Sequence, residues 1–395
     1  MTEIHGKVAP GFEKVRHAFQ ANFDEGKEIG AAFSCYHRGE KVVDLWGGIA
    51  DEATGRPWNE DTIMLVFSTT KGATAICANK LAQEGRLDVD APVAEYWPEF
   101  SANGKADIPV SYLLSHQAGL AWIDGEMTPE EALSWDPVVA ALADQKPSWE
   151  PGSQHGYHAT TYGWLVGEVI RRVTGKSVGT YFREEVAATL GLDFWIGLPE
   201  KEEPRVGMLT PMIPGDLSVE QLRNPGDDPV AQLVASFLGP DTALGKALFA
   251  PGGALTDQKI WNSREMRAAE VPAANGVSDA RSIARMYAAC VGEVDGVRLL
   301  TTEQIKRATT QQTTGPNKVL MEMDIQFGLG FMLPSSLMTL GGPNGFGHFG
   351  AGGSVGWADP DPELGFGYVM NRMDMGMAGD LRSFNLINAC YESIT

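Results

Sequence analysis

Segments that read as β-strands lie at both ends of the chain, and helical patterning fills much of the stretch between them. Near the N-terminus, β-rich runs at about 29–37 and 40–48 flank Arg38-Gly39-Glu40, which predicts a hairpin. In the C-terminal quarter, three short glycine-rich runs are predicted strands: 347–351, 354–358 and 364–371. We therefore expect an α/β (α+β) fold, in which one antiparallel sheet is built from both termini and is flanked by helices.

A predicted all-helical subdomain is inserted in this sheet domain. We assign residues 1–85 and 200–395 to the α/β domain and residues 86–199 to the helical subdomain. Helices are also expected, in chain order, at 11–25, at 69–84, from a cap at Ser278 to Cys290, and at 379–392. Residues 198–260 are rich in Pro and Gly without clear periodicity, which is typical of a lid or pocket wall in an enzyme.

The charge balance excludes several classes of partner. The 395 residues include 51 acidic and 31 basic side chains, and the net charge of −20 repels nucleic-acid phosphates and anionic lipid. The first residues do not read as a secretory signal, and no run of about 18 apolar residues could span a bilayer. Four widely spaced cysteines without a C-x-x-C are typical of buried thiols in a reducing compartment: Cys35, Cys77, Cys290 and Cys390. We expect a cytoplasmic protein with a small-molecule substrate.

The segment Phe67-Ser68-Thr69-Thr70-Lys71 contains an S-x-x-K pattern at the start of a predicted helix. Residues three apart lie on one face of a helix, so Ser68 and Lys71 would be neighbours. The positive end of the helix dipole stabilises negative charge on the serine oxygen, and with burial it lowers the pKa of the lysine. The pattern alone occurs about once by chance in a chain of this length. A capping serine followed by a solvated lysine is the alternative interpretation.

Further motifs accompany this pattern along most of the chain: 85–93, 113–120, 149–159 with its Tyr157-His158-Ala159, 272–276 and 347–353. With these motifs the chain resembles the serine β-lactamase and penicillin-binding protein superfamily. It is most similar to the family VIII carboxylesterases, which have the class C β-lactamase fold.

The resemblance implies a role for each matching residue. Ser68 would be the acylated nucleophile, Lys71 would maintain a proton relay, and Tyr157 would act as general base and then as general acid. The backbone N–H groups of Ser68 and Ala351 would form the oxyanion hole, since donors fixed by secondary structure need no reorganisation. A neighbouring lysine cation would favour the phenolate form of the tyrosine. The resemblance implies no metal and no organic cofactor.

Two departures from the β-lactamase pattern favour an ester as the substrate. His348-Phe349-Gly350 stands where β-lactamases carry Lys-Thr-Gly, and Ala159 replaces the Asn of Tyr-x-Asn. Both departures remove groups that β-lactam recognition uses. His348, Phe349 and Gly350 are predicted to border the substrate site, and Trp357 is a candidate for the wall of an acyl pocket. The expected activity is hydrolysis of small or short-chain acyl esters through a Ser68 acyl-enzyme.

A second serine competes for the role of nucleophile. Gly352-Gly353-Ser354-Val355-Gly356 matches the G-x-S-x-G elbow of α/β-hydrolases. Such an elbow needs a helix after the serine and a later histidine, whereas a β-like run follows Ser354 and no histidine follows His348. We interpret Ser354 as a strand or turn residue.

Three further histidines, His116, His155 and His158, lie within or near the family motifs. We predict a structural role for His116 and pocket-wall positions for His155 and His158, because no third ligand at suitable spacing completes a metal site.

The arrangement of Ser68, Lys71 and Tyr157 could also serve a β-lactamase, a D-amino-acid peptidase or an acyltransferase. From another class, the fold could belong to a catalytically silent binding protein. The oligomeric state is not readable from the sequence.

Overall fold

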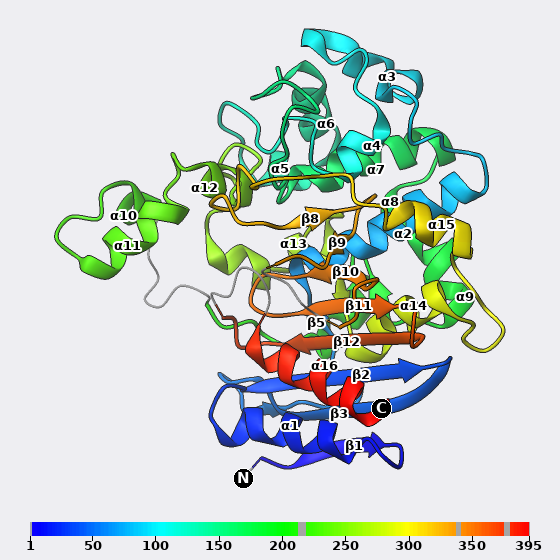
Figure 1. Ribbon diagram of the computed structural model, residues 1–395. Helices are drawn as coiled ribbons and strands as arrows, with labels where there is room; N and C mark the ends of the chain where they lie inside the picture. The colour runs from blue at the N-terminus through cyan, green and yellow to red at the C-terminus, as the bar shows by residue number, and fades with distance from the viewer. Residues whose placement is uncertain (1, 212–218, 337–340, 375–379, 395) are drawn as a thin grey trace.

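A sheet of nine strands assembled from both ends of the chain is the centre of the molecule (Figure 1). The computed structural model describes residues 2–211, 219–336, 341–374 and 380–394. The strand order is β1-β3-β2-β12-β11-β10-β9-β8, with β4 paired to β3, and every pairing is antiparallel. The strands are β1 (Ile4–Val8), β2 (Gly30–His37), β3 (Glu40–Asp51), β4 (Arg56–Pro57), β8 (Gln326–Phe327), β9 (Met332–Leu333), β10 (Phe346–Phe349), β11 (Val355–Asp359) and β12 (Leu364–Met370). The predicted sheet from two termini is confirmed.

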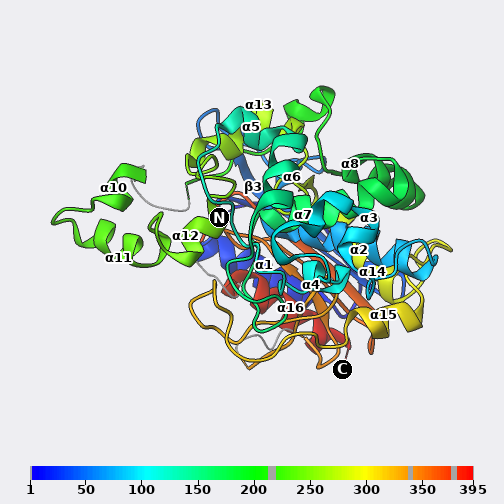
Figure 2. The same ribbon diagram turned by 90° about the horizontal axis from the view of Figure 1, so that it is seen from above.

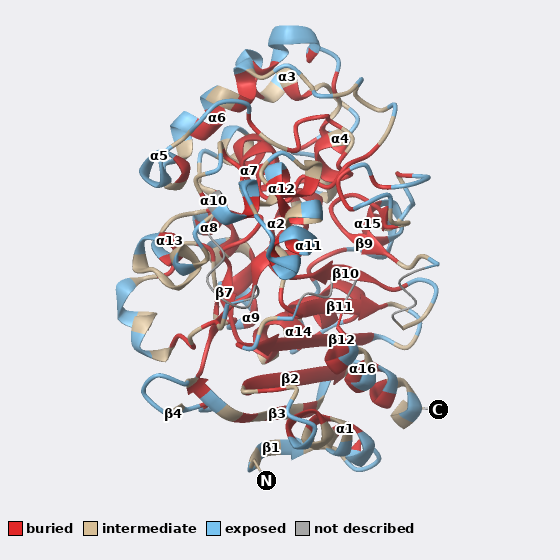
Figure 3. Cartoon of the chain, turned by 90° about the vertical axis from the view of Figure 1, so that its left-hand side faces the viewer, coloured by how far each residue is buried: buried red, intermediate tan, exposed pale blue. Residues whose placement is uncertain are grey.

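The two ends meet where β12 pairs with β2, with Phe366 opposite Cys35. Helices α1 (Glu13–Asp24) and α16 (Leu381–Ile394) pack side by side on one face of the sheet. Helix α14 (Ala280–Val291) covers the strands β2, β11 and β12 from the other face. Gly365 permits this approach, because a Cβ there would lie 2.4 Å from the backbone nitrogen of Ala288. Figure 3 shows that buried residues concentrate on these strands, whereas the outer helices are exposed.

The middle of the chain is mainly helical, as its patterning predicts. Helix α2 (Thr70–Gln83) is largely buried and contacts α7 and α8. The other helices of this part are α3 (Val93–Tyr96), α4 (Val110–Leu114), α5 (Pro129–Leu133), α6 (Trp135–Asp144), α7 (Thr161–Thr174), α8 (Val178–Phe182) and α9 (Ala188–Leu190). A three-stranded sheet of β5 (Met64–Leu65), β7 (Val277–Ser278) and β6 (Phe194–Trp195) joins segments from both sides of the 86–199 boundary. The assignment of two domains stays a prediction.

The described residues of the segment 198–260, which lacks clear periodicity, include three short α-helices. They are α10 (Val219–Arg223), α11 (Pro229–Leu238) and α12 (Ala243–Leu248). Helix α11 buries Ala231, Val234 and Leu238 along one face, but the apolar Val230 and Leu233 are exposed, so its sequence pattern is less clear than its burial. Its start is fixed by Asp228, whose side chain accepts from the backbone N–H groups of Val230 and Ala231. Figures 1 and 2 both show α10 and α11 to one side of the main body.

Short elements complete the described part of the chain: α13 (Arg264–Ala268), α15 (Thr302–Ala308), the π-helix Arg183–Ala187 and the 3-10 helices Phe67–Thr69, Pro98–Gly104, Glu200–Arg205 and Gln258–Asn262. The predicted cap of α14 is off by one residue. Asp279, not Ser278, accepts from the N–H of Ser282, at 2.7 Å. A carboxylate is a strong N-terminal cap, and here it displaces the neighbouring hydroxyl from that position.

All four cysteines are free and buried, as predicted. No helix within the described ranges is both long and apolar enough to cross a membrane.

Candidate active site

Ser68 lies in the 3-10 turn that leads into α2 and is partly exposed, at one wall of a cavity. The preceding residue, Phe67, has a φ of 46°, which is uncommon for a residue other than glycine. Two contacts of the next turn support this conformation: the Thr70 hydroxyl donates to the carbonyl of Phe67 at 2.5 Å and accepts from the N–H of Gly276 at 2.8 Å. The turn that presents the serine is therefore held by side-chain hydrogen bonds rather than by helical ones alone.

Lys71 is fully buried directly behind Ser68. Its Nζ lies 3.0 Å from Ser68 Oγ, 2.6 Å from the carbonyl oxygen of Ala159 and 3.0 Å from the carbonyl oxygen of Ala273. Burial lowers the pKa of the lysine well below its ordinary value, because no carboxylate lies close enough to compensate for the lost hydration. The structure thus brings the two residues of the S-x-x-K pattern together, with the amine biased towards its neutral form.

Tyr157 also contacts Ser68. Its hydroxyl is hydrogen-bonded to the Ser68 side chain, and its ring centroid lies 4.8 Å from Lys71 Nζ. Burial raises the pKa of the phenol above its ordinary value, and the hydrogen bond to Ser68 offsets only part of that increase. At neutral pH the tyrosine therefore rests as a phenol, not as the phenolate that a charged lysine would favour.

Asn317 positions Tyr157 and was not identified from the sequence. Its side-chain oxygen accepts from the backbone N–H groups of Tyr157, Val319 and Leu320 at 2.9–3.1 Å. These bonds tie the tyrosine loop to a segment 160 residues further along the chain. No local pattern around Asn317 signals this role.

The turn between β10 and β11 carries Ala351 and lines the same cavity as Ser68. Among the described residues, no hydrogen-bond acceptor takes the backbone N–H of Ala351. Gly350 allows the turn to press against the serine turn, because a Cβ there would lie 2.2 Å from the carbonyl oxygen of Val66. The two N–H groups assigned to an oxyanion hole thus belong to turns in direct contact.

Ser354 joins these two turns. Its hydroxyl donates to the carbonyl of Val66 at 2.7 Å and lies 3.0 Å from Thr69 Oγ1, while its own carbonyl accepts from the N–H of Gly350 at 2.8 Å. The residue is 1% exposed, and strand β11 rather than a helix follows it. The geometry of a G-x-S-x-G elbow is absent at this position, as expected.

A buried ionic network contacts the turn between β10 and β11 that carries Ala351. Arg382 of α16 donates to the carbonyl of Gly352 at 2.7 Å and to Glu28 at 3.1 Å, and it also pairs with Asp380. Burial raises the pKa of Glu28 to about 7, and the guanidinium offsets part of that shift. These partners are dispersed over more than 350 residues, so no spacing in the sequence reveals the network.

The four residues expected to border the substrate are all buried, and none is among the described residues that line the cavity beside Ser68. His348 is fully buried on β10; its ring centroid lies 6.0 Å from that of Tyr157, and its Nδ1 lies 2.7 Å from the carbonyl of Phe349. Burial and then the charge of Lys71 lower the pKa of His348 to about 3, so the ring is neutral. Phe349 and Gly350 are buried beside it. Trp357 is fully buried against Phe349 and is not one of the described residues that line the cavity.

His116, His155 and His158 hydrogen-bond to the loops around Tyr157. His116 Nδ1 accepts from the N–H of His158, and His158 Nε2 accepts from the N–H of Leu120. His155 Nε2 lies 3.2 Å from the carbonyl of Ile325. The structural role of His116 is consistent with these bonds. His155 and His158 are not among the described residues that line the cavity beside Ser68, and their pocket-wall positions stay a prediction.

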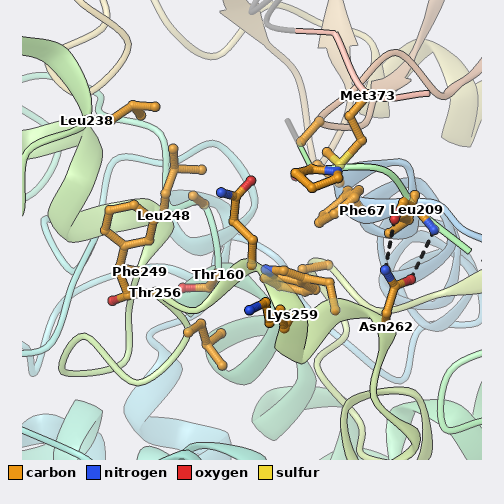
Figure 4. Close-up of a pocket in the computed structure, with 18 of the residues that line it drawn as sticks. Phe67, Thr160, Leu209, Leu238, Leu248, Phe249, Thr256, Lys259, Asn262 and Met373 are labelled. Atoms are coloured by element: carbon orange, nitrogen blue, oxygen red, sulfur yellow. Dashed lines mark hydrogen bonds between the residues drawn. The ribbon is translucent and has the colours of Figure 1, made fainter. Parts of the chain in front are cut away.

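The cavity beside Ser68 has a volume of about 160 Å³ and is lined largely by apolar side chains (Figure 4). One end includes Phe67, Leu209 and Met373. Leu238, Leu248 and Phe249 lie at the opposite end, and the same segment of the chain also contributes Leu222 and Leu255 to the lining. The expectation that residues 198–260 form a pocket wall is confirmed.

Comparison with known proteins agrees with this geometry. The β-lactamase family profile matches residues 15–389, which is nearly the whole chain. The chain belongs to the β-lactamase family. Membership explains why the motifs at 113–120 and 272–276 accompany the S-x-x-K pattern: in this β-lactamase-family protein, Ala273 binds Lys71 and Leu120 anchors His158.

Two relatives and one further solved structure illustrate the similarity. The esterase/β-lactamase LipL of Mycobacterium tuberculosis is 37% identical over 375 residues, covering 94% of this chain and 83% of LipL. The crystal structure of a family VIII carboxylesterase is 41% identical, with a TM-score of 0.86 and coverage of 99% of this chain and 100% of that chain. EstA from Arthrobacter nitroguajacolicus Rue61a is 35% identical, with a TM-score of 0.85 and coverage of 100% and 98%. The predicted resemblance is confirmed at the level of both sequence and fold.

Proposed function

We propose that this protein is a serine hydrolase that cleaves carboxylic esters through a Ser68 acyl-enzyme. The observation that carries the proposal is the position of Ser68 Oγ, which lies 3.0 Å from Lys71 Nζ and is hydrogen-bonded to Tyr157. A serine between a neutral amine and a phenol has both a proton acceptor and a proton donor within reach. LipL is named an esterase/β-lactamase, and the solved relative of 41% identity is named a carboxylesterase, which supports the same activity.

The two carbonyl partners of Lys71 favour this lysine as the first proton acceptor. A neutral amine has two N–H bonds and one lone pair. The carbonyl oxygens of Ala159 and Ala273 accept the two N–H bonds, so the lone pair is left for the third contact, Ser68 Oγ. Burial lowers the pKa of this amine, which favours the neutral form that carries the lone pair.

Tyr157 is then assigned mainly to the leaving group. The Ser68 proton passes to Lys71, Oγ bonds to the ester carbonyl carbon, and the carbon–alkoxide bond breaks as Tyr157 gives its proton to the departing alcohol. Lys71 then returns a proton to the tyrosine, whose ring centroid lies 4.8 Å from Nζ. In the second half, water gives its proton to this pair and attacks the acyl carbon, which releases the acid and restores Ser68.

The backbone N–H groups of Ser68 and Ala351 are assigned to the developing oxyanion. Both residues line the cavity, and the N–H of Ala351 has no acceptor among the described residues. Donors of this kind act without reorganisation, and removal of one typically costs about 10²–10³ in kcat.

An ester fits this site better than a β-lactam. A β-lactam brings a carboxylate, but His348 is neutral and buried and its Nδ1 is engaged by the carbonyl of Phe349. Ala159 offers no side-chain hydrogen bond to an acylamino group. Each polar group left poorly paired costs roughly 1–3 kcal/mol. β-Lactam hydrolysis is the second candidate, because LipL carries both activities in its name.

Two measurements test the proposal. A fluorophosphonate probe should label the wild type at Ser68 and should not label Ser68→Ala. In a panel of p-nitrophenyl acetate, p-nitrophenyl butyrate and a cephalosporin, we expect kcat/KM for the esters to exceed that for the lactam by about 10² or more, the combined effect of two lost contacts. Absence of labelling at Ser68 would refute the mechanism, and equal efficiency on both classes would refute the ester preference.

The four free, buried thiols also support a reducing compartment such as the cytoplasm, which we include in the proposal. Retention of the native fold and activity in a strong thiol reductant is the expected result, and inactivation by the reductant would contradict it.

A further inference from the structure

Three polar residues in the wall of the cavity, Asn262, Thr160 and Thr256, are hydrogen-bonded within the protein. Asn262 exchanges two hydrogen bonds with the backbone of Leu209, at 2.8 and 3.0 Å, as the dashed lines in Figure 4 mark. The hydroxyls of Thr160 and Thr256 donate to the carbonyls of Ala250 and Gly253, at 3.0 and 2.5 Å. With these groups occupied, the wall presents mainly carbon to a ligand, which is the property of a site for an apolar chain.

The leaving alcohol belongs on the other side of Ser68. Tyr157, which we assign as its proton donor, is not one of the described residues that line the cavity, whereas Ser68 and Ala351 are. The group that fills the cavity is therefore the one attached to the carbonyl carbon, the acyl chain.

A second cleft lies beyond the far end of this cavity. It has a volume of about 530 Å³, and Phe249 and Thr256 line both spaces. Figure 4 shows Phe249 and Thr256 together at the end opposite Phe67, the neighbour of the nucleophile. Phe249 is only partly buried, in keeping with a ring that faces two open spaces. The second cleft is more polar, since Arg223, Lys246 and Asp257 contribute to its lining.

We infer that Phe249 is the end wall of an acyl pocket and limits the substrates to esters of linear apolar acids of medium length. This inference rests on the proposed ester hydrolysis and specifies its substrate class. Each methylene that is buried along the cavity improves kcat/KM by about fourfold. A chain that reaches Phe249 gains nothing from further methylenes, because it must displace the ring or turn back towards water.

The test is a series of p-nitrophenyl esters from acetate through butyrate, hexanoate, octanoate and decanoate to dodecanoate. For the wild type we expect kcat/KM to rise from acetate, to reach a maximum at medium length and to fall by dodecanoate. Phe249→Ala opens the wall to the second cleft and should raise the dodecanoate-to-butyrate ratio at least about tenfold, which corresponds to about two more buried methylenes. Phe249→Trp should move the maximum towards shorter chains.

Met127→Ala is the matched control, because Met127 lines the second cleft and not the acyl cavity. By itself it should leave the chain-length profile unchanged. Fluorophosphonate labelling of Ser68 and the thermal midpoint establish whether each variant is folded. If Phe249→Ala does not fold, Phe249→Trp provides the test. An unchanged profile in a folded, labelled Phe249 variant would overturn the inference, as would an effect of Phe249→Ala that follows the length of the alcohol in alkyl acetates instead. Failure of the wild type to label or to hydrolyse any ester would instead refute the proposed function.

Discussion

Replacement of Ser354 by alanine separates a supporting serine from a nucleophile. The Ser354 hydroxyl connects the turn that carries Ser68 to the turn that carries Ala351, through Val66 and Thr69. In Ser354→Ala, the carbonyl of Val66 keeps the hydrogen bond that it accepts from the N–H of Thr69 at 3.2 Å. The buried hydroxyl of Thr69 loses the partner at 3.0 Å.

The magnitude follows from these two contacts. One hydrogen bond to a still-satisfied carbonyl and one buried hydroxyl left without its partner together lower the free energy of unfolding by about 1–3 kcal/mol. The catalytic effect should be smaller than the loss of an oxyanion donor, which costs about 10²–10³, because both N–H groups remain and only their spacing relaxes. We therefore expect kcat to fall by less than about 10², while KM changes little.

The assay combines urea unfolding, steady-state hydrolysis of p-nitrophenyl butyrate and fluorophosphonate labelling. Ser354→Ala should remain labelled, whereas Ser68→Ala should be folded, unlabelled and inactive. Ser34→Ala is the matched control: Ser34 is a fully buried serine on β2 that donates to the carbonyl of Val43 at 2.9 Å, away from the site. It should lose stability without losing kcat. A folded Ser354→Ala protein that is no longer labelled would refute our assignment of the nucleophile. A variant with unchanged stability and kcat would refute the proposed role of the Ser354 hydroxyl in connecting the two turns.

Three further outcomes are expected. Lys71→Ala and Tyr157→Phe should each lower kcat at least about 10², and the double variant should lose less than the product of the two, because the residues act as one relay; near-normal kcat in Tyr157→Phe would assign the proton donor elsewhere. Arg382→Lys should lower the free energy of unfolding by about 3–5 kcal/mol, since the fork that pairs with buried carboxylates is lost; a change below about 1 kcal/mol in urea unfolding would contradict this. Glu28 has its pKa raised from 4.5 to about 7, so its proton stabilises the folded state below pH 4.5 and this contribution is lost as the pH rises through about 7. Relative to Glu28→Gln, the wild type should therefore lose up to about 1.4 kcal/mol per pH unit within that window, and parallel stability curves for the two proteins would refute the assignment.

The sequence by itself determined the features that depend on local spacing or on family motifs. Ser68 and Lys71 are three residues apart at the start of a helix, so their proximity follows from helix geometry alone. The strand patterns at the two ends, together with the helical middle, were sufficient to predict a sheet built from both termini. The motif around Tyr157 placed a phenol at the same site through the resemblance, without any information on distance.

Only the tertiary structure decided how these groups are charged and what surrounds them. The two carbonyls that direct the lone pair of Lys71 come from Ala159 and Ala273, which are 88 and 202 residues away. Their approach depends on every segment that packs around the site. So does the burial that lowers the pKa of the lysine and raises that of the phenol. The same holds for Phe249, because a side chain becomes the wall of a pocket only when other segments enclose the space in front of it. Local patterns encode neighbours along the chain, whereas dielectric environment and cavity shape are sums over contacts between distant residues.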